Sequence, residues 1–147
     1  MTFNLTKDQI EIQQRARQIA STLVAENAVE VDKSEQYPWD NVKALTDAGF
    51  VGMTIPKEYG GPGRSFLEAN LVVEEMAAYC GPTGRIAVEA NMGAISAVMH
   101  YGTDFQKRLA AELVLAGDKP AICITEPDAG SAASQMTTRA DKRGDKY

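Results

Sequence analysis

The sequence Ala121-Ile122-Cys123-Ile124-Thr125-Glu126-Pro127-Asp128-Ala129-Gly130-Ser131 marks the point where the chain changes character. Its first residues form a short apolar run, which predicts a buried strand. Pro127 then begins a loop of small residues that includes Gly130. Thr125, which carries a hydroxyl, is the last residue of the predicted strand. Ser131, which also carries a hydroxyl, follows Gly130. An apolar wall with close backbone approach and exposed donors suits a flat apolar cofactor with a polar rim.

Before residue 118 the hydrophobic pattern is helical. The pattern predicts five helices, which begin near Thr6, Pro38, Ser65, Gly84 and Thr103. Three of these starts carry a capping box, formed by Thr6 with Gln9, Ser65 with Glu68, and Thr103 with Gln106. Most connections are short, except for the loop from about 50 to 64, so neighbouring helices are expected to pack antiparallel.

The predicted helix Gly84–Tyr101 differs from the other four. It is rich in Ala, Ile, Val and Met and has few charges. A helix that is apolar on most sides is packed on several faces, so we expect it at the centre of the bundle. Gly81-Pro82 is expected to stop the helix before it.

After Lys119 the sequence predicts strands. Ala121–Thr125 is expected to be one, and Thr137–Asp141 with Asp145–Tyr147 are expected to form a hairpin around Arg143-Gly144. So few strands cannot cover a sheet face. The predicted fold is therefore mainly α: an antiparallel bundle of about five helices over residues 1–118, followed by the first strands of an incomplete β-domain over residues 119–147.

Composition narrows the class of protein. The 147 residues carry a net charge of −5, which disfavours a nucleic-acid surface. Cys80 and Cys123 are too few for a disulfide framework, so reduced thiols and a cytoplasmic setting are expected. No apolar run reaches the roughly 20 residues of a membrane span. The single histidine, His100, is expected to be a favourable charge at a helix end, and no metal site is predicted.

The stretch from Ala121 to Ser131 resembles the signature of the acyl-CoA dehydrogenase family, which are flavoproteins. The matching residues are Cys123, Ile124, Thr125, Glu126, Ala129, Gly130 and Ser131. Ala132 departs from the family pattern, which usually has Asp there. Ile55–Gly61 resembles a second family motif, a Pro-x-Glu-Tyr-Gly-Gly loop, and Glu89–Gly93 resembles a third. Their order is similar to that of the family's N-terminal helical domain followed by the start of its middle β-domain.

This resemblance implies an oxidoreductase of fatty acid metabolism that uses FAD to dehydrogenate acyl-CoA thioesters between the α and β carbons. A base removes the α-proton while the β-hydrogen leaves as hydride. The family's base comes from a later helical domain, so no catalytic residue is expected here, and the 147-residue chain alone is predicted to be inactive. The resemblance also implies an electron-transfer flavoprotein or similar acceptor and a homotetramer in the full-length protein.

The resemblance also assigns site residues. Those expected at the flavin are Ile122, Cys123, Ile124, Thr125 and Ser131. Ser131 is also expected to contact acyl-CoA, together with Glu89 and Ala90 on the helix that would line the acyl pocket. Glu89 has a simpler alternative, a carboxylate that is either exposed or paired within the bundle. Glu126 is expected to be a structural acceptor that fixes its loop, and Ile55–Gly61 a turn that positions helices.

Two other interpretations stay open at this point. The first is a non-catalytic helical interaction module or partner subunit derived from the same family. The second is a family branch with other flavin chemistry, because nothing in the chain fixes the acyl group, its carrier or the electron acceptor.

Overall fold

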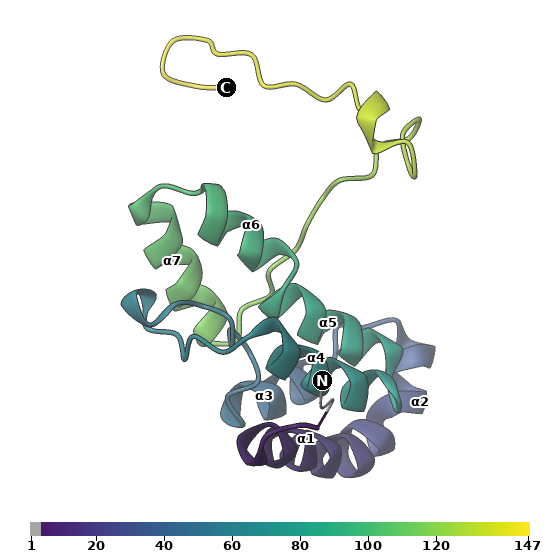
Figure 1. Cartoon of the computed structure of the whole chain (residues 1–147). Coiled ribbons are helices and arrows are strands. Elements are labelled where there is room, and N and C mark those ends of the chain that lie inside the picture. Colours follow the sequence, from purple (N-terminus) through teal and green to yellow (C-terminus); the bar gives the residue numbers. More distant parts are fainter. Residues whose placement is uncertain (1–3) are drawn as a thin grey trace.

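The computed structural model describes residues 4–147 and shows helices in a compact body, followed by an arm that leaves it (Figure 1). The helices are α1 (Lys7–Ile19), α2 (Ala25–Ser34), α3 (Trp39–Asp47), α4 (Phe66–Ala77), α5 (Gly81–Asn91), α6 (Ala94–Tyr101) and α7 (Asp104–Leu115). A π-helical segment, Ala20–Val24, joins α1 to α2, and short 3-10 turns lie at Lys57–Tyr59 and Ala133–Gln135. No helix among the described residues is long and apolar enough to cross a membrane.

Four of the five predicted helix starts are confirmed; the fifth, near Gly84, is wrong, because α5 begins at Gly81. The side chains of Thr6, Ser65 and Thr103 each accept the backbone N–H three residues later, and each Gln or Glu at that position returns a bond to the cap backbone. These local bonds satisfy N–H groups that the first helical turn leaves without partners. Pro38 precedes α3, as predicted.

The core lies where α1, α4 and α5 meet the loop that follows α3. Its largest fully buried side chains include Phe50, Leu45, Ile55 and Met76. Gly84 lets α4 and α5 approach closely, because a Cβ there would lie 2.6 Å from the Cβ of Ala77.

An ion pair ties α1 to α4 beside this core. The Arg17 guanidinium donates to both carboxylate oxygens of Glu75, with N···O distances of 3.0 and 2.6 Å. The Glu75 side chain is only 8% exposed, whereas that of Arg17 is 59% exposed. The two oxygens therefore keep donors although the carboxylate is largely removed from water.

The prediction of one continuous helix over Gly84–Tyr101 is wrong. The segment is helical, but α5 ends at Asn91 and α6 begins at Ala94, with Met92 and Gly93 between them. Gly81-Pro82 does not merely stop α4; these residues form the first turn of α5. Proline is well placed there, because the first turn needs no N–H from it.

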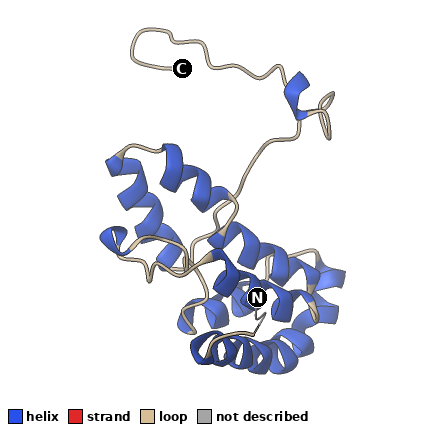
Figure 2. Cartoon of the chain, in the orientation of Figure 1, coloured by secondary structure: helices blue, strands red, loops and turns tan. Residues whose placement is uncertain are grey.

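The predicted strands are not found in the described residues. Ala121–Thr125 has no ladder partner, and the two hairpin arms are not strands (Figure 2). The arm has only two isolated bridges, Glu126 with Ala129 and Arg143 with Lys146. The predicted turn at Gly144 is present, with a positive φ of 68°.

The physical reason is that a strand needs a neighbour to pair its N–H and C=O groups. The arm runs away from the helices and meets no second extended segment (Figure 1). Ile122 and Ile124 accordingly stay 42% and 47% exposed instead of buried. The division into a helical domain to 118 and a β-domain from 119 stays a prediction.

Candidate functional site

The break between α5 and α6 is built around the Glu89 carboxylate. Its Oε2 accepts the backbone N–H of Ala94, at an N···O distance of 3.1 Å, and so caps the start of α6. Its other oxygen pairs with the guanidinium of Arg85, one turn earlier on α5. The Glu89 side chain is 12% exposed. Glu89 therefore lies in the paired state that the simpler alternative described.

Asn91 fixes the loop after α3 to the end of α5. Its Nδ2 donates to the carbonyls of Phe50 and Ala87, both at 2.9 Å, and its Oδ1 accepts the N–H of Met53 at 2.7 Å. Asn91 is fully buried. Sequence reasoning missed it, although a polar amide at a buried helix position within the Glu89–Gly93 motif was a signal that could have found it.

The Ile55–Gly61 loop packs against the body as predicted for a structural turn. Ile55 is fully buried, and its carbonyl accepts the N–H of Gly63 at 2.9 Å. Only glycine fits at Gly61, because a Cβ there would lie 2.2 Å from the Ile55 carbonyl oxygen. Gly52 donates its N–H to the carbonyl of Ala90, which is itself buried.

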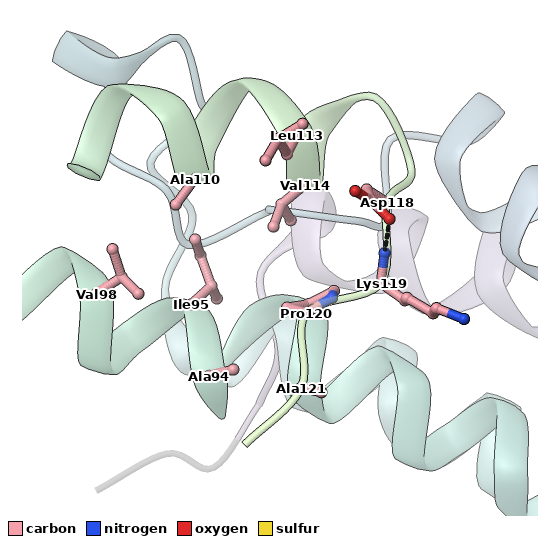
Figure 3. A pocket seen from close by; sticks show the side chains of 10 residues that line it. All are labelled: Ala94, Ile95, Val98, Ala110, Leu113, Val114, Asp118, Lys119, Pro120 and Ala121. Atoms are coloured by element: carbon pink, nitrogen blue, oxygen red, sulfur yellow. Dashed lines mark hydrogen bonds between the residues drawn. The ribbon is translucent and has the colours of Figure 1, made fainter. Parts of the chain in front are cut away.

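An apolar pocket lies between α6, α7 and the start of the arm (Figure 3). Its volume is about 210 Å³, and its walls include Ile95 and Val98 from α6, Val114 from α7, and Pro120 with Ala121 from the arm. A wider apolar groove of about 530 Å³ runs between the same two helices toward Tyr101. The helix predicted to line an acyl pocket thus meets the segment that leads into the cofactor motif.

The five residues predicted at the flavin all lie on the exposed part of the arm. Ile122, Cys123, Ile124 and Thr125 follow the pocket directly, and Ser131 lies beyond the turn formed by Glu126 and Ala129. Cys123 is a free, exposed thiol, whereas Cys80 is free and buried. Glu89 and Ala90 lie on α5, in the helical body. The roles assigned to all these residues stay predictions.

Glu126 holds the arm in shape, which confirms its expected structural role. Its Oε2 accepts the backbone N–H of Thr137 and its Oε1 that of Thr138, both at 2.8 Å. These bonds stabilise the ionised form and lower the pKa of Glu126 to about 2. A carboxylate that stays ionised and accepts backbone bonds is an anchor for the loop, not a proton donor.

The chemistry of these residues fits a flavin. Ile122 and Ile124 present apolar surface that could cover a flat ring, and the exposed hydroxyls of Thr125 and Ser131 could donate at its polar edge. Within residues 4–147, no group of three or more His, Cys, Asp or Glu side chains is arranged to hold a metal ion.

Residues 6–118 match the family model described as acyl-CoA dehydrogenase, N-terminal domain. The chain is 61% identical over 145 residues to a 3-sulfinopropanoyl-CoA desulfinase from Variovorax paradoxus, covering 99% of this chain and 36% of that protein. It is 36% identical over 148 residues to a short-chain specific acyl-CoA dehydrogenase from Clostridium acetobutylicum, covering 100% of this chain and 39% of that protein.

Among solved structures, a glutaryl-CoA dehydrogenase from Mycobacterium smegmatis in complex with FADH2 matches with a TM-score of 0.84 and 27% identity, covering 95% of this chain and 36% of that one. The chain thus spans little more than a third of the length of these relatives. Together with the match to the family model over most of its length, this shows that the chain belongs to the acyl-CoA dehydrogenase family and corresponds to the N-terminal part of its members.

Proposed function

We propose that this chain is the N-terminal part of a flavoenzyme that acts on a short acyl-CoA thioester carrying a sulfinate group at C3. The observation that carries this proposal is the difference in identity between two relatives. The desulfinase from Variovorax paradoxus is 61% identical and the short-chain acyl-CoA dehydrogenase is 36% identical, each over almost the whole chain.

Desulfination of such a thioester breaks the C3–S bond and forms a C3–H bond. One water is consumed, and the products are propanoyl-CoA and hydrogen sulfite, so that atoms and charge balance. The carbon gains the electrons that the sulfur loses, and none leaves for an outside acceptor. Desulfination is thus a reaction other than dehydrogenation, and it falls under the family branch with other flavin chemistry that the sequence left open.

The cofactor proposed for this site is FAD; when bound it would supply the hydride acceptor that the dehydrogenation requires, whereas the net desulfination transfers no electrons to it. Ile122 and Ile124 would cover its ring, Cys123 would contribute its backbone to the same wall, and Thr125 and Ser131 would donate to its polar edge. Glu89, Ala90 and the apolar walls of α6 would bound the acyl group, and Ser131 would also contact the CoA portion. These contacts bind and orient; the proton transfers would fall to residues outside this chain.

A second candidate is the α,β-dehydrogenation that the family resemblance implies. The match to a short-chain acyl-CoA dehydrogenase favours it. In that case an electron-transfer flavoprotein or a similar acceptor is needed, and we retain it as the expected partner. The similarity to the N-terminal parts of enzymes makes a non-catalytic module the least supported interpretation. The homotetramer and the cytoplasmic setting stay predictions.

The test compares two activities of the protein expressed from its complete natural reading frame and purified with FAD. Sulfite release from 3-sulfinopropanoyl-CoA without dye reduction supports desulfination. Butyryl-CoA-dependent dye reduction without sulfite release overturns it in favour of dehydrogenation. Failure of both assays in a protein that holds FAD overturns both substrates. The isolated 147-residue chain is expected to show neither activity, and turnover by it would contradict the placement of the proton-transferring residues elsewhere.

Two hydroxyl variants test the cofactor site. Thr125→Val keeps the shape of the side chain and removes its donor, so we expect weaker FAD retention and a shifted flavin absorption band. Ser131→Ala is expected to raise the KM for the thioester, weaken FAD retention, or both. Ser21→Ala, which removes an exposed hydroxyl that donates to the carbonyl of Gln18 three residues earlier, is the matched control. Unchanged flavin spectra and KM values in both variants would remove these residues from the site.

A further inference from the structure

The chain leaves α7 through a tightly defined turn. The N–H of Gly117 donates to the carbonyl of Val114 at 2.9 Å, and that of Asp118 donates to the carbonyl of Leu113 at 3.0 Å. This pair of bonds is the Schellman pattern, and the positive φ of Gly117, 89°, allows it. A Cβ on Gly117 would lie 2.8 Å from Oγ1 of Thr46, so the turn is seated closely on α3.

The next residue is held by two aromatic rings at the start of α3. The Nζ of Lys119 lies 5.0 Å from the centre of the Tyr37 ring and 5.3 Å from that of the Trp39 ring. The two rings pack edge to face, with centroids 4.7 Å apart. We call Tyr37, Trp39 and Lys119 the aromatic clasp. Burial, with the nearby Asp118 carboxylate, raises the pKa of the Tyr37 phenol.

The two residues that follow Lys119 contact α6 and α7, on the side of the chain opposite to α3. Pro120 and Ala121 line the pocket together with Ile95 and Val114; Lys119 also borders it, but the ammonium end of its side chain points away from it (Figure 3). Adjacent residues of the chain are thus held by α3 on one side and by α6 and α7 on the other. Their position and direction are fixed just before Ile122.

We propose that Lys119 is a positioning residue, whose clasp with Tyr37 and Trp39 sets the register in which Ile122–Thr125 and Ser131 meet the flavin. This inference rests on the proposed function. In an extended segment a shift of one residue moves the chain by about 3.3 Å and turns each side chain to the opposite face. A displaced arm would therefore present Cys123 where Ile122 or Ile124 should lie.

The strength of the clasp sets the size of the expected effect. A cation over an aromatic face at a partly exposed site contributes about 0.5–1 kcal/mol. Trp39 is 50% exposed, which places the clasp in that class. Loss of the cation should therefore weaken FAD binding about two- to fivefold through the arm.

The experiment uses Lys119→Met, Lys119→Arg and Lys43→Met in the protein expressed from its complete natural reading frame, with FAD titrated into the apoprotein. Lys43→Met is the control, because Lys43 is an exposed residue of α3 whose pair with Asp47 lies at the surface. Flavin binding, the visible circular dichroism of bound flavin and the melting temperature are compared. Trp39 emission is isolated by subtracting the matching Trp39→Phe variant.

The proposal expects Lys119→Met to change Trp39 emission, weaken FAD binding and alter the flavin dichroism. Lys119→Arg, which keeps the cation, should give the values of the unsubstituted protein in all three measurements. Lys43→Met should leave all three unchanged. A lower melting temperature for Lys119→Met with normal flavin binding and dichroism would show a purely structural contact and overturn the proposal. So would unchanged Trp39 emission. If the unsubstituted protein holds no FAD, the proposed function itself fails, which separates that outcome from failure of the clasp.

Discussion

Glu89 and Ala94 are joined across the gap between α5 and α6 by a bond from the Ala94 N–H to the Glu89 carboxylate, with an N···O distance of 3.1 Å. A carboxylate at this position satisfies an orphan N–H and complements the positive end of the α6 dipole. The apolar segment that reads as one helix thus becomes two, and the second one is directed along α7.

Gly93→Ala is expected to break that contact. A Cβ on residue 93 would lie 2.1 Å from Oε2 of Glu89, so the carboxylate must leave the Ala94 N–H. We expect a loss of about 1–2 kcal/mol in the free energy of unfolding, measured with urea. Gly81→Ala is the matched control, because a Cβ there meets nothing within 4 Å. The same loss for Gly93→Ala in a Glu89→Ala background would show that the contact is not the cause.

Asn91→Ala should be more damaging. The substitution leaves the buried Met53 N–H and the Phe50 carbonyl without their side-chain partner, so a loss of about 2–4 kcal/mol is expected. Asn70→Ala removes a comparable amide whose bond to the Phe66 carbonyl is exposed, and it should change stability by less than about 0.5 kcal/mol. Equal effects of the two variants would mean that Asn91 does not anchor the loop.

Arg17→Met should lower the melting temperature by more than Lys43→Met does. The first leaves the carboxylate of Glu75 largely buried without its partner, whereas the second breaks a pair whose two side chains are 71% and 64% exposed. The double variant Arg17→Met/Glu75→Met should recover most of the loss, because it removes the unpaired charge. Thermal unfolding followed by circular dichroism measures all three; a double variant no more stable than Arg17→Met would contradict this account.

The arm should loosen in acid. The pKa of Glu126 is lowered from 4.5 to about 2, so its bonds to Thr137 and Thr138 favour the folded arm above the unfolded pKa and are lost as the pH falls toward 2. As the pH falls from about 4.5 to about 2, the arm should open more often, and the Thr137 and Thr138 amides should lose protection against hydrogen exchange. Glu126→Gln should show fast exchange at neutral pH. Protection that is independent of pH and unaffected by Glu126→Gln would contradict the anchor role.

The three helix starts that carry a capping box were predictable because their signals are local. Thr6, Ser65 and Thr103 each find a partner three residues away, and such a bond forms whatever the rest of the chain does. The structural role of Glu126 followed instead from the family resemblance, because its partners Thr137 and Thr138 lie 11 and 12 residues away. The family motifs were also legible, since they are runs of residue types at fixed spacing.

The interruption at Gly93 and the state of Ala121–Thr125 were decided by tertiary structure. Periodicity shows that residues 84–101 are apolar, but only the packed Glu89 carboxylate and the buried Asn91 show where the helix stops. Ala121–Thr125 has the composition of a strand, yet strand pairing is a bond to another segment, and none of the described residues supplies it. The sequence by itself determined which residues cap the helices, whereas burial was not fixed by it, since Ile122 and Ile124 are exposed and Asn91 is buried. The tertiary structure alone decided where distant groups such as Lys119 and Tyr37 meet, because that depends on how the helices pack.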